Sequence, residues 1–253
     1  MKHGRIYLNG SVQHVTERNG KVCLPDGRLL GEQEVQWLPP VKPGTIFALG
    51  LNYADHAKEL AFNAPEKPLV FLKGRNTVTA HRCVTRRPKD ATFMHYECEL
   101  AVIIGRQGKN IQKENAYDHI AGYSIGNDYA IRDYLENYYR PNLRVKNRDD
   151  CTPIGPWLVD RADIPDPGAL SLKTYVNGKL TQEGSTSDMI FDIPALIAYL
   201  SEFMTLNPGD IILTGTPEGL ADVKAGDEVV TEIEHVGRLV NTIVDDETYF
   251  GLT

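Results

Sequence analysis

The sequence lacks the features typical of membrane-embedded, secreted and nucleic-acid-binding proteins. No apolar run among its 253 residues approaches the roughly 18 that a membrane span requires. The opening residues MKHGRIYLNG contain no apolar stretch of the kind found in a signal peptide. The 27 basic residues are outnumbered by 34 acidic ones, and the net charge of −7 argues against nucleic acid as the main partner. We therefore expect a soluble cytoplasmic protein that has neither a membrane nor a nucleic acid as a partner.

Cysteine is scarce, and its spacing argues against two kinds of site. The four cysteines are widely separated and form no C-x-x-C pair, so we expect reduced thiols rather than a disulfide framework or a structural zinc site. The sequence also shows no internal repeat and no low-complexity tract. Its length suits one large domain, alone or with a small appendage.

Turn dipeptides predict a small antiparallel unit at the start of the chain. Asn9-Gly10 and Asp26-Gly27 each separate two short apolar segments, as in a β-hairpin. The segment LPPVKPG, with three prolines and a glycine, then reads as a linker. We therefore divide the chain into an N-terminal β unit, residues 1–40, and a catalytic domain, residues 41–253.

The second part of the chain is mostly strand-forming, which predicts an α+β fold that is mostly β. A further hairpin turns at Asn177-Gly178, and DEVVTEIEHVGRLVNTIV alternates like two paired strands. The clearest helix is FDIPALIAYLSEFM, with Asp192 as N-cap and Pro194 in its first turn. Its predicted apolar stripe consists of Leu196, Ile197, Leu200, Phe203 and Met204. A second helix is expected over YAIRDYLENYY, after the strand AGYSIGND.

Two glutamates stand at the head of an otherwise apolar strand, MHYECELAVIIG. Because residues two apart share a face, Glu97 and Glu99 project together, while Cys98 and alternate apolar residues line the other face. Paired carboxylates repel each other and are costly to bury alone, so they either lie in water or are held by a cation. Asp128, at the end of another strand, either caps the following helix or supplies a third carboxylate. Three such groups would suit Mg²⁺, or Mn²⁺ or Ca²⁺ in its place.

Two further groups of residues could carry chemistry. In NYADHAKE, Glu59 lies three residues after His56 and could orient its imidazole as a general acid or base, although an amphipathic surface helix explains the same pattern. A cationic cluster in RDYLENYYRPNLRVKNRDD, together with FLKGRN, could bind an anionic small molecule. The alternative for most of these cations is a solvated surface balanced by neighbouring acidic residues.

Together these motifs resemble the fumarylacetoacetate hydrolase (FAH) superfamily. They follow the family's order from residue 45 to about 244: GLNYADHAKE, FLKGRNTV, YECELAVIIG, GYSIGNDYAIRD, VKNRDDCTPIGPW and ILTGTPEGL. Within the family, YLENYYRPNLRVKNRD is most similar to bifunctional decarboxylase/isomerases of 4-hydroxyphenylacetate breakdown, and especially to the C-terminal half of their tandem form. The resemblance implies a mixed β-roll, present as a homodimer or in a hetero-oligomer with a homologous subunit.

The resemblance also implies an activity and a site. The substrate would be a small anionic 2-oxo di- or tricarboxylate. The reactions would be decarboxylation of 5-oxopent-3-ene-1,2,5-tricarboxylate and isomerisation of 2-hydroxyhepta-2,4-diene-1,7-dioate to 2-oxohept-3-ene-1,7-dioate, with Mg²⁺ as cofactor. The implied residues are the metal ligands Glu97, Glu99 and Asp128, the catalytic residues His56, Glu59 and Lys146, and the substrate-binding residues Tyr53, Lys73, Arg132, Gly215 and Thr216. Arg132 is expected one helical turn after Asp128.

Three other functions stay open at this point. The chain could be another enzyme of the family, such as an acylpyruvate hydrolase, an oxaloacetate decarboxylase or a fumarylacetoacetase-like enzyme. It could perform only one of the two half-reactions. It could also be a non-catalytic, metal-stabilised ligand-binding module, although the presence of His56, Glu59 and Lys146 beside the metal ligands argues against this.

Overall fold

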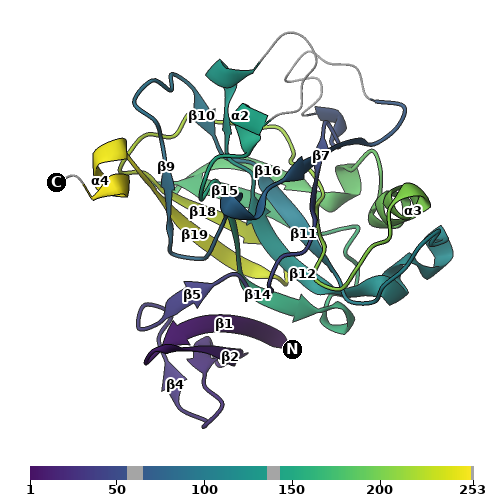
Figure 1. Ribbon diagram of the computed structural model, residues 1–253, viewed down its shortest axis with the longest axis horizontal. Coiled ribbons are helices and arrows are strands. Elements are labelled where there is room, and N and C mark those ends of the chain that lie inside the picture. The colour runs from purple at the N-terminus through teal and green to yellow at the C-terminus, as the bar shows by residue number, and fades with distance from the viewer. Residues whose placement is uncertain (56–64, 136–142, 252–253) are drawn as a thin grey trace.

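Most strands of the chain belong to one mixed sheet in the computed structural model, which describes residues 1–55, 65–135 and 143–251 (Figure 1). Neighbouring strands are antiparallel except β17–β6 and β14–β8. Off the main path, β5 (Gln36–Leu38) pairs with β1 and β8 (Val78–Thr79) with β14. The path runs through β4 (Leu29–Leu30), β3 (Lys21–Cys23), β2 (Ser11–Arg18), β1 (Lys2–Leu8), β14 (Thr152–Asp160), β12 (Ile120–Asn127), β11 (Cys98–Ile104), β17 (Ile211–Leu213), β6 (Ile46–Gly50) and β7 (Leu69–Lys73).

Two smaller sheets and a few short helices complete the described fold. The five-stranded sheet has the order β16 (Lys179–Ser185), β15 (Ser171–Val176), β18 (Glu228–Ile233), β19 (Gly237–Val244) and β9 (Val84–Arg86). The two-stranded sheet pairs β10 (Met94–His95) with β13 (Ala130–Ile131). The α-helices are α2 (Leu143–Lys146), α3 (Ile193–Phe203) and α4 (Asp246–Phe250), and the 3-10 turns are η1 (Arg75–Thr77), η2 (Lys113–His119), η3 (Arg132–Tyr134), η4 (Arg161–Asp163) and η5 (Thr186–Asp188). The mostly-β class predicted from the sequence is confirmed.

The predicted hairpin turns are present. Asn9-Gly10 joins β1 to β2 and Asn177-Gly178 joins β15 to β16, with all four residues at positive φ. Positive φ at both central residues is what the tightest hairpin turn requires, and Asn-Gly adopts it at little cost. Asp26-Gly27 lies in the connection between β3 and β4, as predicted. Asn19-Gly20 forms another such turn, between β2 and β3, which the sequence analysis missed.

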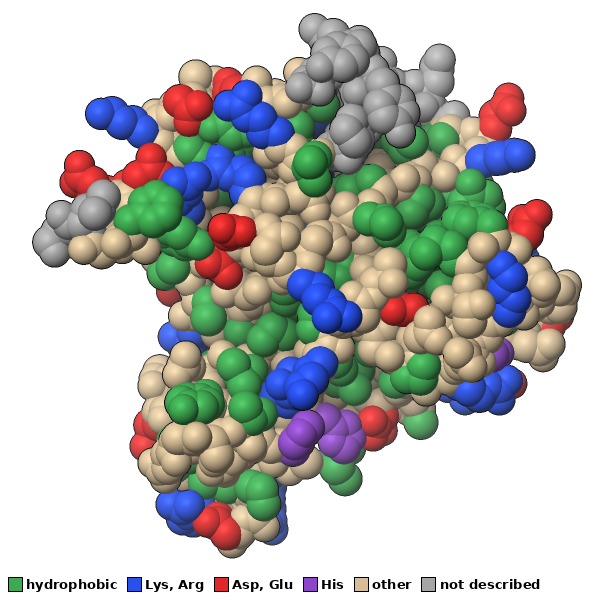
Figure 2. All heavy atoms as spheres, viewed as in Figure 1, with side chains coloured by type: hydrophobic (Ala, Val, Ile, Leu, Met, Phe, Trp, Pro, Cys, Tyr) green, Lys and Arg blue, Asp and Glu red, His purple; other side chains and the backbone are tan. Residues whose placement is uncertain are grey.

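Strands β1 to β5 form a lobe at one end of the molecule (Figures 1 and 2). The lobe has its own apolar cluster, which includes Ile6, Val15, Val22 and Trp37. It is nonetheless joined to the rest of the molecule, because β1 pairs with β14 and Trp37 packs edge-on against Trp157 with ring centroids 4.9 Å apart. A domain boundary near residue 40 stays a prediction.

Helix α3 begins as predicted but its buried stripe is shorter. The Asp192 carboxylate accepts a hydrogen bond from the backbone N–H of Ala195 at 2.8 Å, which caps the helix. Leu196, Ile197 and Leu200 are buried. The prediction was wrong for Phe203, which is 55% exposed at the last turn of the helix and packs on Tyr199 instead of the core. The stripe ends early because the helix ends at that turn, where Met204 takes an extended conformation.

The helix expected over YAIRDYLENYY is wrong in its described part. Residues 130–131 form β13 and pair with β10, and residues 132–134 make a single 3-10 turn. Asp128 is therefore no helix N-cap, and Arg132 does not follow it by one α-helical turn. A local pattern could not reveal this pairing, because its partner strand lies about 36 residues earlier in the chain.

The sequence analysis expected neither disulfides nor a membrane span. All four cysteines are free. Within the described ranges, no helix has both the length and the apolar character needed to cross a membrane.

Candidate metal centre

Three acidic residues meet where β11 begins and β12 ends. The two strands are antiparallel with Cys98 opposite Asn127, which places Glu97 and Glu99 beside Asp128. One carboxylate oxygen from each residue lies within 4.8 Å of the others, and all three residues are buried. The Asn127 side-chain oxygen accepts a hydrogen bond from the backbone N–H of Glu97 at 2.9 Å and fixes this arrangement. The carboxylates that the sequence singled out are thus brought together away from water.

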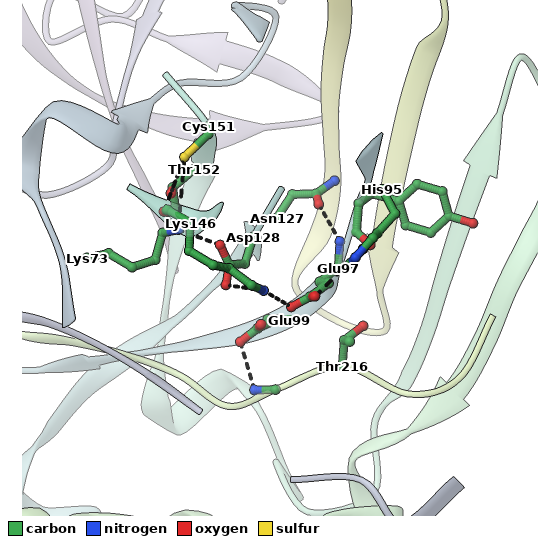
Figure 3. Close-up of polar contacts among 12 residues, drawn as sticks. Lys73, His95, Glu97, Glu99, Asn127, Asp128, Lys146, Cys151, Thr152 and Thr216 are labelled. Carbon is green, nitrogen blue, oxygen red and sulfur yellow. Dashed lines mark hydrogen bonds and ion pairs between the residues drawn. The ribbon is translucent and has the colours of Figure 1, made fainter. Parts of the chain in front are cut away.

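Two lysines lie against the carboxylates (Figure 3). The Lys146 ammonium donates to Glu97 Oε2 at 2.5 Å and to Asp128 Oδ2 at 2.8 Å. The enclosed Lys73 ammonium donates to Asp128 Oδ1 and to the backbone carbonyl of Lys146. Burial on its own would lower the pKa of Lys146, but the carboxylates of Asp128 and Glu97 outweigh it and raise that pKa. Lys146 therefore stays charged, and the geometry of Lys73 favours a role in positioning Asp128 over direct contact with a substrate.

Glu99 has an oxygen available for a cation. Its Oε2 accepts a hydrogen bond from the backbone N–H of Gly215 at 2.7 Å, whereas its buried Oε1 has no hydrogen-bond partner among the described residues. Burial, reinforced by the charges of Asp128 and Glu97, raises the pKa of Glu99 well above its usual range. A buried oxygen without a partner, in a cluster of carboxylates, fits a divalent cation that prefers oxygen ligands.

Gly215 can make this contact because it lacks a side chain. Its φ is +91°, and a Cβ at this position would lie 3.0 Å from the Cβ of Asn52. Both features disfavour any other residue. Gly215 thus shapes the site through its backbone.

Behind Glu97 lies a histidine that the sequence analysis did not single out. His95 is fully buried, and its Nε2 accepts a hydrogen bond from Arg132 Nε at 2.9 Å. Its Nδ1 lies 3.0 Å from the carbonyl of Tyr96 and 3.7 Å from Glu97 Oε1. Burial lowers the pKa of His95 to about 3, so the imidazole is neutral. The sequence could have indicated this residue, because His95, Glu97 and Glu99 occupy alternate positions and so share one face of an extended chain.

Of the other predicted residues, two are buried in the described part of the chain and two lie outside it. Tyr53 is fully buried with its hydroxyl unpartnered among the described residues, and Thr216 is buried with its hydroxyl accepting a hydrogen bond from Gln182 at 2.9 Å. Gln182 was not anticipated. His56 and Glu59, the predicted acid–base pair, lie outside the described residues.

The motifs and the fold together match a known family. The family model described as the fumarylacetoacetate (FAA) hydrolase C-terminal domain matches residues 45–244. The chain belongs to this family. The prediction of family membership is confirmed.

Several relatives have named activities, and one of them is an isomerase/decarboxylase. The chain is 61% identical over 216 residues to the 4-hydroxyphenylacetate degradation bifunctional isomerase/decarboxylase of Salmonella dublin. The match covers 85% of this chain and 50% of that protein, so the chain spans about half the length of this relative.

Solved structures of the FAH family share the whole fold. The structure of 5-carboxymethyl-2-hydroxymuconate delta-isomerase from Mycobacterium smegmatis superposes with a TM-score of 0.85 at 37% identity, over 97% of this chain and 99% of that one. Maleylpyruvate hydrolase from Sphingobium sp. SYK-6, in complex with manganese(II) and pyruvate, superposes with a TM-score of 0.83 at 26% identity and the same coverage. A member of this family therefore binds a divalent metal, and the buried acidic cluster of this chain could do so.

Proposed function

We propose that this chain is a divalent-metal-dependent isomerase and decarboxylase of 4-hydroxyphenylacetate breakdown. It would decarboxylate 5-oxopent-3-ene-1,2,5-tricarboxylate and convert 2-hydroxyhepta-2,4-diene-1,7-dioate to 2-oxohept-3-ene-1,7-dioate. The observation that carries the proposal is the buried cluster of Glu97, Glu99 and Asp128 with Lys146 lying against it. The 61% identity to a bifunctional isomerase/decarboxylase supports the choice of substrate.

We propose that Glu97, Glu99 and Asp128 hold Mg²⁺, for which Mn²⁺ or Ca²⁺ can substitute. The bound cation would supply Lewis acidity at the 2-oxo-carboxylate end of the substrate. Lys146, charged and adjacent to the cluster, would stabilise the negative oxygen that develops when the carbon–carbon bond to CO₂ breaks and its electrons enter the conjugated 2-oxo group. His56, oriented by Glu59, would then carry the proton that isomerisation transfers from the enol oxygen to carbon.

A substrate panel tests this proposal. With Mg²⁺ present, we expect CO₂ release from the tricarboxylate and loss of the ultraviolet absorbance of the hydroxydiene dioate faster than an enzyme-free control, which corrects for spontaneous ketonisation. Addition of EDTA should abolish both signals. Lys146→Met is expected to lower kcat by roughly a hundredfold while leaving the protein folded.

Among the alternative reactions, cleavage of acylpyruvates is favoured by a specific comparison. The likeness to maleylpyruvate hydrolase favours including it in the panel. If the chain hydrolysed an acylpyruvate faster than it isomerised the hydroxydiene dioate, the isomerase/decarboxylase proposal would be wrong. Activity on only one of the two pathway substrates would restrict the chain to that half-reaction.

We also propose that the chain acts in the cytoplasm as a homodimer or with a homologous subunit. The support is that the chain spans half of the Salmonella dublin relative, so a second chain could supply what the other half contributes there. Light scattering of the purified protein should give at least twice the 28.2 kDa mass of one chain. A monomer with full activity on both substrates would contradict this.

A further inference from the structure

A line of three side chains runs from η3 to the acidic cluster. Arg132 Nε contacts His95 Nε2 at 2.9 Å, and on the other side of the ring His95 Nδ1 lies 3.7 Å from Glu97 Oε1. One imidazole ring therefore separates a guanidinium from a predicted metal ligand. The backbone reinforces the line, because His95 pairs with Ala130 in the β10–β13 sheet and the Arg132 N–H donates to the carbonyl of Phe93 at 3.0 Å.

The chemistry of arginine fixes the direction of these hydrogen bonds. A guanidinium only donates, so His95 Nε2 must accept, and the ring hydrogen must lie on Nδ1. That N–H donates to the carbonyl of Tyr96 at 3.0 Å and faces Glu97. His95 is fully buried, so water cannot replace it as the acceptor for Arg132 Nε.

The contact with His95 uses only one edge of the Arg132 side chain. The two terminal nitrogens of its guanidinium make no hydrogen bond to another described residue, and the side chain is only partly buried. A guanidinium held at Nε and open at its terminal nitrogens can bind a carboxylate with two parallel hydrogen bonds.

We propose that His95 is a positioning residue that holds Arg132 so that its terminal nitrogens bind the substrate carboxylate remote from the metal. This inference rests on the proposed function, in which the substrate carries such a second carboxylate. It assigns to His95 a part in selecting dicarboxylates over monocarboxylates.

Calorimetry with two ligands that differ only in the remote carboxylate tests this role. We would titrate 2-oxoadipate and 2-oxohexanoate into the Mg²⁺-loaded protein. His95→Phe removes the acceptor for Arg132 Nε and should weaken 2-oxoadipate binding about tenfold or more, the value of a hydrogen bond to a charged group. Binding of 2-oxohexanoate should change less than about twofold. His95→Gln, whose amide oxygen can still accept, should recover most of the lost affinity.

Two further variants separate positioning from a general structural effect. In the Arg132→Gln background, His95→Phe should cause no additional loss, because the group it positions is already gone. His119→Gln is a matched control: His119 also contacts an arginine, Arg106, with 3.2 Å between ring and guanidinium nitrogens, but it lies at the opposite end of β12 from Asp128. This control should bind both ligands as the wild type does.

Several outcomes would overturn the inference. The first is that His95→Phe weakens the binding of both ligands equally, and the second is that its loss adds to that of Arg132→Gln in the double variant. The third is that the wild type shows no preference for 2-oxoadipate. The fourth is that the weaker 2-oxoadipate binding of His95→Phe is explained by a weaker affinity for Mg²⁺. Because binding needs no turnover, the two proposals fail separately. An inactive wild type with His95-dependent selectivity contradicts only the proposed function, and an active enzyme without that selectivity contradicts only the role of His95.

Discussion

Each carboxylate of the proposed metal centre should contribute to Mg²⁺ affinity through its own oxygen ligand. We expect Glu97→Gln and Asp128→Asn to weaken Mg²⁺ binding in calorimetry by roughly a hundredfold, because even residues behind the ligands contribute about 10- to 100-fold in such sites. Asp118→Asn, at an exposed position, is the matched control. Normal affinity in both ligand variants would move the metal to another site.

Replacing Glu99 should stabilise the metal-free protein, although it removes a proposed metal ligand. Its pKa is raised because burial and the neighbouring carboxylates disfavour its charge. Glu99→Gln removes that charge, so we expect a higher melting temperature in EDTA and no further increase when Mg²⁺ is added. A lower melting temperature in EDTA would show that the carboxylate is stabilised by something other than the cation.

The buried contact between Lys73 and Asp128 should matter far more than a similar pair at the surface. Lys73→Met leaves Asp128 without a partner at Oδ1 and should lower the free energy of unfolding by about 3–5 kcal/mol. Lys173→Met breaks the exposed pair with Glu183, 3.0 Å apart, and should change the free energy of unfolding far less, because water and salt screen an exposed ion pair. Urea unfolding measures both variants, and similar losses would contradict the difference in burial.

At the scale of residues, the sequence predicted the grouping of the carboxylates better than the contacts that surround them. The alternation around Cys98 placed Glu97 and Glu99 on one face, and the structure confirms that placement. The contact of Lys73 with Asp128 could not be predicted, because 55 residues separate them. Such a contact depends on how strands far apart in the chain meet.

The elements of the N-terminal lobe meet the rest of the protein at a buried histidine. His81, between β8 and β9, accepts a hydrogen bond from the backbone N–H of Val240 at 3.1 Å, while its Nε2 lies 3.5 Å from Glu32 of the lobe. Burial lowers the pKa of His81 to about 4, partly offset by Glu32. His81 therefore stays unprotonated in the folded protein at a pH where it is protonated in the unfolded chain, in which its pKa has the ordinary value of about 6.5.

Stability should therefore fall as the pH drops from about 6.5 towards 4. The contribution of His81 to this loss should reach about 3 kcal/mol. His81→Asn keeps an acceptor for Val240 but has no proton to gain, so its free energy of unfolding should depend less on pH over this range. Urea unfolding at several pH values, with the exposed His235→Asn as control, checks the difference. Parallel pH curves for wild type and His81→Asn would refute it.

At the scale of elements, local signals succeeded where the local sequence decides the structure. Asn-Gly turns and the Asp192 cap are of this kind, because neighbouring residues supply every group involved. Residues 130–131 failed because a strand partner 36 residues away outweighed their helical pattern. Tertiary pairing of this kind overrides local propensity.

For the whole molecule, metal binding should appear as thermal stability. A cation that binds only the folded chain stabilises it by about 2.7 kcal/mol at a hundred times its Kd. For a protein of this size, that corresponds to a rise in Tm of roughly 5–10 °C. Differential scanning calorimetry with Mg²⁺ and with EDTA measures the shift, and Asp128→Asn should abolish it. A Tm independent of Mg²⁺ would contradict a metal site in the folded protein.

The pairing of distant strands also sets the order in which this protein can become functional. β17 pairs with β6 across some 165 residues, and the loop after β17 brings Gly215 to Glu99. Because such distant pairings form late, Mg²⁺ should slow unfolding and leave the refolding rate unchanged. On the ribosome, the chain must be synthesised past Gly215 before the site is complete, so the cation can enter the complete site only after that residue has been added.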